Sequence, residues 1–210
     1  MTPTFKVEII DVTKSVGYER YLYKCLSPMP FRRYRARSRY LESAIPRGLH
    51  KKVLFLNGDA VGQIEYASPE ASGYPITGNN IIVMNCIWVL RRAEGRNFGR
   101  LLMREMMESE SDRSGFATIS LEGYWSPWFK RWQMEMLGFR VINSIEVMHR
   151  TKHQGERFKI HLMWLPRSED AEPPKWDEEK MLEGVDFCMA HPLYHPQGYK
   201  ERFILRRVKT

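Results

Sequence analysis

The loop at residues 94–100 carries the clearest chemical signal in the chain. It reads Glu-Gly-Arg-Asn-Phe-Gly-Arg and follows a nearly all-apolar run at residues 81–90, which predicts a buried strand. Gly95, Asn97 and Gly99 are residue types that tolerate unusual backbone angles. An amphipathic helix is predicted to follow. Free N–H groups and the helix dipole meet at a helix start, so the pattern favours an anion site, the alternative being a plain strand-helix joint.

Two common phosphate-binding loops do not fit this stretch. A P-loop requires Lys followed by Ser or Thr after its last glycine, whereas Gly99 is followed by Arg100 and Leu101. A dinucleotide-binding fold requires a G-x-G-x-x-G pattern, and the separation between Gly95 and Gly99 is wrong for it. The loop therefore needs a different interpretation.

The spacing around this loop resembles the acetyl-CoA motif of the GCN5-related N-acetyltransferases, the GNAT superfamily. In that motif a strand ending in Val is followed by four residues, then by Arg-Gly-x-Gly-x-Gly and a Leu-Leu helix. Here Val89 is followed by four residues and then by residues 94–99 and Arg100-Leu-Leu. Two positions depart from the motif: Glu94 stands where Arg or Gln is usual, and Asn97 stands where the middle Gly is usual.

A second match lies further along the chain. The predicted strand Ile119-Ser-Leu-Glu122 is followed by Gly138-Phe139, with the separation that the family shows between its Leu-Glu-Val strand and a later Gly-Phe. The resemblance covers roughly residues 50–145. Residues 86–89 (Cys-Ile-Trp-Val) and 171–176 (Ala-Glu-Pro-Pro-Lys-Trp) also look like a bacterial and archaeal branch of unassigned substrate.

The resemblance implies an α/β (α+β) fold: a mixed, mostly antiparallel central sheet flanked by helices, with a C-terminal extension. It also implies an N-acetyltransferase that uses acetyl-CoA as co-substrate, without a metal, and passes the acetyl group directly to a small-molecule or peptide amine. The strand backbone and the loop amides would bind acetyl-CoA. The residues concerned are Ile87, Trp88, Val89, Glu94, Gly95, Arg96, Asn97, Phe98, Gly99 and Arg100.

The resemblance also places a general base and exposes a missing general acid. Glu122 matches the glutamate that serves as base in some relatives, although it could instead be a strand residue bonded to backbone. The family's proton-donating tyrosine is replaced by Met134, which cannot donate a proton. Tyr124 is the candidate acid; otherwise solvent protonates the thiolate or activity is absent. Cys86 is either a nucleophile or, as we favour, a small core residue.

Composition fits a packed cytoplasmic protein. The chain has 210 residues, 43% of them apolar, and lacks the run of roughly 20 apolar residues that spans a membrane. Its three widely separated cysteines, Cys25, Cys86 and Cys188, argue against a disulfide framework. The net charge of +8 suits polyanionic ligands such as acyl-CoA but equally serves solubility. We expect a monomer or homodimer.

The order of elements predicts an acetyltransferase domain at residues 1–166 and a packed extension at 167–210. The predicted strands are 5–11, 51–57, 60–67, 81–89, 116–122, 139–150 and 157–165, and Asn57-Gly58 indicates a type I′ hairpin. The predicted helices are 14–26, 31–44, 99–113, one capped by Ser126 with Pro127 at its first position, and 177–182. Residues 68–80 form either an active-site flap or a surface loop.

Two further patterns leave other functions open. Arginines alternate with tyrosines at residues 32–40, which suits nucleic acid, although a solvated helix face explains them better. Cys188, His191 and His195 have a metal-like rhythm but supply only three ligands, so we expect no metal there. A non-catalytic acyl-CoA-binding protein is the main alternative to an enzyme, and a nucleic-acid-binding protein is a weaker one.

Overall fold

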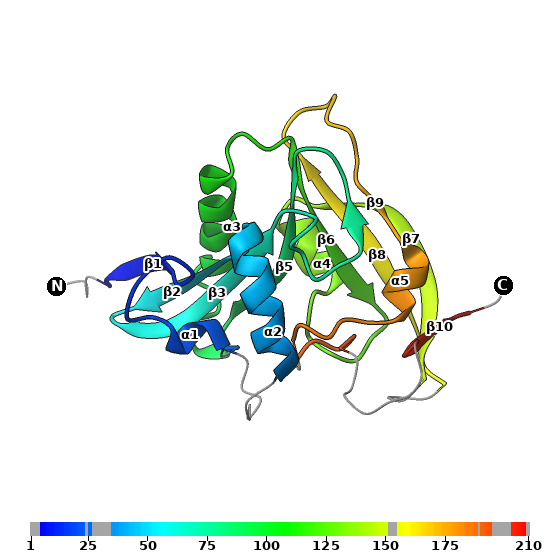
Figure 1. Cartoon of the computed structure of the whole chain (residues 1–210), viewed down its shortest axis with the longest axis horizontal. Coiled ribbons are helices and arrows are strands. Elements are labelled where there is room, and N and C mark those ends of the chain that lie inside the picture. The colour runs from blue at the N-terminus through cyan, green and yellow to red at the C-terminus, as the bar shows by residue number, and fades with distance from the viewer. Residues whose placement is uncertain are drawn as a thin grey trace.

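The computed structural model describes residues 5–23, 25–26, 35–150, 155–188, 190–194 and 203–208. A twisted eight-stranded sheet runs through the molecule in the order β1-β2-β3-β5-β6-β8-β7-β10 (Figure 1). Its strands are β1 (Val7–Asp11), β2 (His50–Leu56), β3 (Asp59–Ala67), β5 (Ile81–Val89), β6 (Gly115–Glu122), β7 (Arg140–His149), β8 (Arg157–Pro166) and β10 (Leu205–Arg207). The predicted mixed, mostly antiparallel sheet is confirmed.

Helices cover this sheet, and a small second sheet lies beside it. The α-helices are α1 (Arg20–Tyr23), α2 (Arg35–Ala44), α3 (Phe98–Ser109), α4 (Arg131–Met136) and α5 (Glu178–Leu182). The second sheet pairs β4 (Ile76–Thr77) with β9 (Lys175–Trp176), and two 3-10 turns are η1 (Ile45–Arg47) and η2 (Arg91–Ala93).

The sheet opens between β5 and β6. These two strands are parallel, and they pair only where Ile81–Val83 lies beside Gly115–Ala117. One extra residue, Asn85, forms a bulge in β5, because Met84 and Cys86 pair with adjacent residues of β3. A bulge bends its strand and increases its twist. Beyond these pairs β5 and β6 are not hydrogen-bonded to each other, so the sheet has a gap between their carboxyl halves.

Helices α2 and α3 lie on opposite faces of β3, since successive side chains of a strand point to opposite faces. On one face, Gly62 leaves room for Leu102 of α3, whose Cδ1 would stand 3.3 Å from a Cβ added at the glycine. On the other face, Glu65 forms an ion pair with Arg37 of α2. This two-sided cover buries β3, which pairs with β5 on the side away from the gap.

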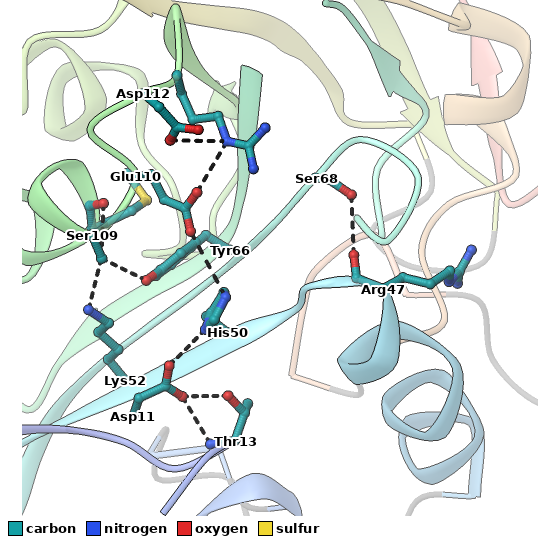
Figure 2. Close-up of polar contacts among 12 residues, drawn as sticks. Asp11, Thr13, Arg47, His50, Lys52, Tyr66, Ser68, Ser109, Glu110 and Asp112 are labelled. Carbon is teal, nitrogen blue, oxygen red and sulfur yellow. Dashed lines mark hydrogen bonds and ion pairs between the residues drawn. The ribbon is translucent and has the colours of Figure 1, made fainter. Parts of the chain in front are cut away.

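A polar network fixes the carboxyl end of α3 to the sheet (Figure 2). Lys52 Nζ on β2 donates to Ser109 Oγ over 2.9 Å, and the Tyr66 hydroxyl on β3 lies 3.1 Å from the same oxygen. His50 Nδ1 contacts Asp11 Oδ2 on β1 at 2.7 Å. Because α3 is held at this end, the position of its opposite end is also fixed.

Several local predictions were correct and others were wrong. Asn57 and Gly58 both have positive φ, 52° and 87°, as a type I′ turn requires. The helix predicted at 14–26 shrinks to α1, because Gly17 takes a φ of 87° and interrupts it. Of the helix predicted at 31–44, the described part is α2, and residues 31–34 lie outside the described residues.

The Ser126 cap was also wrong. Helix α4 begins at Arg131 with Lys130 as its N-cap, while Ser126 Oγ accepts from the Trp128 N–H in a turn. The physical reason is that Leu121 N–H on β6 donates to the Phe129 carbonyl over 2.7 Å. This bond holds residues 128–130 against the strand and delays the helix start.

The segments after residue 166 share the main core. Strand β10 extends the sheet by pairing with β7, and β9 pairs with β4 inside the 68–80 loop. Phe187, Leu193 and Ile204 are all buried in the same apolar cluster as the central strands. The 68–80 loop is thus anchored by the extension and is not a detached flap. The domain boundary at residue 166 stays a prediction.

Candidate active site

A cleft of about 490 Å³ lies at the open edge of β5. It is bordered by the end of β5, the start of α3 and one side of α4. Nine of the ten residues predicted to bind the cofactor line it, Arg96 being the exception. The lining residues are Ile87, Trp88, Val89, Ala93, Glu94, Gly95, Asn97, Phe98, Gly99, Arg100, Pro127, Phe129, Trp132, Gln133, Met134, Met136 and Leu137.

The wall formed by β5 has a free backbone edge. Residues 87–89 pair with β3 on one side, and no described strand pairs with them on the side of β6. Trp88 is fixed in place by stacking on Trp128, with ring centroids 4.6 Å apart. Peptide groups on such an edge can pair with an extended ligand that carries amides, as an added strand would.

The start of α3 faces the same cleft. Asn97 takes the left-handed conformation, with φ 58° and ψ 19°, so asparagine does supply the geometry of the glycine it replaces. The first helical bond runs from Leu101 N–H to the Asn97 carbonyl, and the Asn97 side chain makes no capping bond. A Cβ added to Gly99 would meet nothing within 4 Å. The uncapped helix start is therefore open to an anion.

Arginines near Glu94 divide into different roles. Glu94 is exposed just after η2 and lines the cleft. Arg100 lines the cleft as well, whereas Arg96 lies over the Phe5 ring at 4.8 Å. Arg92 pairs with Asp59 at 3.9 Å. Of these three arginines, Arg100 is the one that shares the cleft with Glu94.

The inner end of the cleft is apolar. Met134 and Phe129 line it, and both are buried. Position 134 thus faces the cleft, and this is the position where the resemblance expects a tyrosine. The methionine supplies packing surface there and no proton.

Glu122 lies at the exposed end of β6 and is not among the residues that line the cleft. Its Oε2 contacts His161 Nε2 at 2.9 Å and Arg131 at 3.4 Å. Desolvation raises the pKa of this carboxyl, but the hydrogen bonds from His161 and Arg131 outweigh it and lower the pKa below its ordinary value. Glu122 is therefore ionised at neutral pH, and its basicity is reduced.

Tyr124 and Cys86 are both buried. The Tyr124 ring packs on Phe158 of β8, with centroids 4.5 Å apart, and it does not line the cleft. Burial raises the pKa of the Cys86 thiol, and its sulfur lies 3.5 Å from Gln63 Nε2. Because the thiolate is the nucleophilic form, this environment favours the interpretation of Cys86 as a core residue.

One arrangement at the β5 bulge had no signal in the sequence. The Tyr74 hydroxyl donates to the Asn85 carbonyl over 3.2 Å and lies 2.7 Å from His191 Nε2. His191 Nδ1 accepts from the Leu193 N–H at 3.2 Å. The Asn85 amide donates to the Tyr40 hydroxyl over 2.6 Å. Tyr74 and His191 are 117 positions apart in the sequence, and their contact supports the bulge in β5.

The histidine at the centre of the metal-like spacing contacts protein groups instead. Both ring nitrogens of His191 contact protein groups, and His195 lies outside the described residues. Within the described ranges, no group of three or more potential metal ligands comes together.

Among the described residues, none of the helices has the length and apolar character needed to span a bilayer.

Comparison with known proteins identifies the fold. No family model and no curated protein matches this sequence. Among solved structures, the chain is similar to a GNAT-family protein from Desulfovibrio desulfuricans, with 13% identity, a TM-score of 0.56, and coverage of 78% of this chain and 100% of that one. It is also similar to the ribosomal-protein-S18-alanine N-acetyltransferase of Escherichia coli, with 11% identity, a TM-score of 0.50, and coverage of 81% and 100%.

A third similar structure is a Bacillus subtilis acetyltransferase in complex with CoA, with 11% identity, a TM-score of 0.50, and coverage of 79% of this chain and 100% of that one. The chain therefore has the fold of the GNAT acetyltransferases. At these identities, the likeness establishes the fold and leaves the reaction to be argued from the site.

Proposed function

We propose that this protein is an N-acetyltransferase that binds acetyl-CoA in the cleft beside β5 and transfers the acetyl group to an amine. The observation that carries the proposal is the union, in one cleft, of a free strand edge and an uncapped helix start. The first can pair with the amides of the pantetheine arm, and the second can hold the pyrophosphate. Gly99 adds to the fit, because the space a side chain would fill is open.

When bound, acetyl-CoA supplies an acetyl thioester, and the chain must then handle two protons. Glu122 is the proposed base that removes a proton from the attacking amine, and it is ionised for that task. Tyr124 remains the proposed donor to the departing thiolate. Since neither side chain lines the cleft, both roles require that the acceptor amine and the thioester meet outside the cleft lining.

A non-catalytic acyl-CoA-binding protein is the second candidate. It is favoured by Met134, which places a thioether at the cleft position where a proton donor is expected. A nucleic-acid-binding function has less support, because Arg37 is buried and paired with Glu65. Arg32 and Arg33 lie outside the described residues.

Calorimetric titration with acetyl-CoA tests the proposed cofactor site. Gly99→Leu adds a good helix former whose side chain enters open space in the cleft, so we expect a folded protein with affinity reduced at least tenfold, about 1.4 kcal/mol. Gly99→Ala is the matched control and should bind within a few-fold of the wild type. Undiminished binding by the leucine variant would place the cofactor elsewhere.

A second experiment separates the enzyme from the binding protein. A panel of small amines and peptide N-termini is offered with acetyl-CoA, and release of the CoA thiol is followed. An acceptor that raises thiol release above the rate without acceptor supports transfer. Tight acetyl-CoA binding together with no acceptor-dependent release favours the non-catalytic alternative.

A further inference from the structure

Three polar side chains on neighbouring strands form a hydrogen-bonded chain outside the cleft. Ser144 Oγ on β7 lies 2.6 Å from His161 Nδ1 on β8. His161 Nε2 lies 2.9 Å from Glu122 Oε2 on β6. The register accounts for the first contact, since Ser144 stands directly opposite His161. A nucleophile, a base and an orienting carboxylate are thereby placed in order.

The donors and acceptors of these three side chains determine where their protons lie. An ionised carboxylate can only accept, so His161 Nε2 carries a hydrogen and donates it to Glu122. Burial, together with the charges of Arg131 and Lys159, lowers the pKa of His161 despite the opposing contact with Glu122, so the ring is neutral at pH 7. Nδ1 of the neutral ring then has a lone pair directed at the Ser144 hydroxyl, which donates to it.

The solvent exposure of Ser144 and His161 also fits a nucleophile and its base. Ser144 is exposed, while the His161 side chain is only 3% exposed and is held between its neighbours. The Ser144 N–H donates to Asn143 Oδ1 over 2.6 Å, and Asn143 in turn donates to Glu178 of α5 over 3.3 Å. The hydroxyl is thus reachable from solvent, and the backbone beneath it is supported.

The other neighbour of His161 shows that the contact with Ser144 is selective. Ser120 on β6 stands opposite His161 on its other side. Its hydroxyl is buried and has no hydrogen-bond partner among the described residues. Two serines therefore flank one histidine, and only the exposed one is bonded to it.

We propose that Ser144, His161 and Glu122 form a nucleophilic site that hydrolyses small carboxylic esters; it lies outside the acetyl-CoA cleft and shares only Glu122 with the proposed acetyl transfer. Ser144 Oγ attacks the ester carbonyl as its proton passes to His161 Nδ1. The bond to the alkoxide breaks, and the alcohol leaves with that proton. Water then attacks the acyl-Ser144 ester, gives a proton to His161 and releases the carboxylic acid. Ser144 recovers the proton, so the cycle needs no other reactant.

Labelling with phenylmethanesulfonyl fluoride tests the site, because this reagent modifies activated serines. We expect one label on the intact protein, mapped to Ser144 by peptide mass spectrometry and absent in Ser144→Ala. Ser120→Ala is the matched control, since it removes a serine beside the same histidine that makes no bond to it. It should be labelled like the wild type.

Hydrolysis of p-nitrophenyl acetate gives the second readout. His161→Gln retains a polar side chain but no base, so both labelling and hydrolysis should fall by on the order of 10²-fold or more. Labelling elsewhere than Ser144, no labelling at all, or equal labelling of folded His161→Gln would overturn the proposal. Acetyl-CoA binding by Ser144→Ala should be unchanged, because Ser144 does not line the cleft. The variants tested here leave Glu122, the one shared residue, unchanged, so failure of the esterase leaves the acetyltransferase proposal standing, and the reverse also holds.

Discussion

Replacing Glu65 tests the buried charge cluster that joins α2 to the sheet. The carboxylate of Glu65 is 4% exposed and accepts two bonds from the Arg37 guanidinium, at 2.8 and 3.0 Å. Lys51 Nζ lies 3.1 Å from the same carboxylate and is fully buried. Arg37 also donates to the Leu22 carbonyl, so the cluster ties both N-terminal helices to β3.

The magnitude can be worked from the pKa of Glu65. Burial raises this pKa, but attraction to Arg37 and Lys51 outweighs burial and lowers it from 4.5 to about 2. At about 1.4 kcal/mol per pH unit, the ionised carboxylate contributes on the order of 3 kcal/mol to the free energy of unfolding at neutral pH. Removing one partner of a buried ion pair costs a similar amount, about 3–5 kcal/mol. We expect Glu65→Gln to lower Tm by roughly 10 °C.

The pH dependence has a defined sign. Because the folded-state pKa lies below the unfolded value, the contribution of Glu65 is complete above about pH 4.5 and is lost as pH falls through about 2. The difference in stability between the wild type and Glu65→Gln should therefore shrink over that window. Urea denaturation followed by circular dichroism at pH 7, 4 and 3 measures it.

The exposed pair of Lys6 and Glu8, 3.1 Å apart, provides the control. Glu8→Gln should cost less than about 1 kcal/mol, since solvent screens such a pair. If the free energy of unfolding of Glu65→Gln lies within about 1 kcal/mol of the wild-type value at pH 7, the cluster does not stabilise the fold as argued. A difference that is constant from pH 7 to 3 would contradict the assigned pKa.

Further expectations concern the two proposed proton carriers and the bulge. Glu122→Gln should lower kcat by roughly 10²–10⁴ while acetyl-CoA affinity measured by calorimetry stays unchanged; equal kcat would remove it as the base. Tyr124→Phe should slow transfer in steady-state assays, and adding Met134→Tyr, which places a phenol on the cleft wall, should recover part of the rate. An unaltered kcat in Tyr124→Phe would leave solvent as the acid. His191→Phe deprives Tyr74 of a buried partner, so the free energy of unfolding should fall by about 1–3 kcal/mol and acetyl-CoA affinity should fall with it. Unchanged affinity in a destabilised variant would show that the bulge does not depend on this contact.

Features set by local backbone chemistry could be predicted from the sequence. The Asn57-Gly58 turn and the left-handed Asn97 depend on one or two residues, and both were predicted correctly. The strand at 81–89 was predicted with its observed bounds because its apolar run is long. Ser126 shows the opposite case. Its local capping signal predicted a helix start there, but the backbone bond between Leu121 and Phe129 holds this segment against β6, and the helix begins at Arg131.

Features set by register could not be predicted in this way. The hairpin of β7 and β8 was expected, but a shift in pairing between Val141 and Asn143 decides which residue stands opposite His161. Without that shift, Ser144 would face a different neighbour, because a one-residue slip turns every side chain to the other face. The contact between Tyr74 and His191 likewise depends on tertiary packing across most of the chain.

The link between His191 and the β5 bulge has a consequence for folding during synthesis. Strands β5 and β6 are synthesised well before residue 191, so they are made before the histidine that supports the bulge. Bringing together segments so far apart in sequence carries a loop-closure cost, and such contacts form slowly. We expect nascent chains stalled before residue 191 to form the sheet without a fixed bulge, so that acetyl-CoA binding is acquired only after residue 191 has been made.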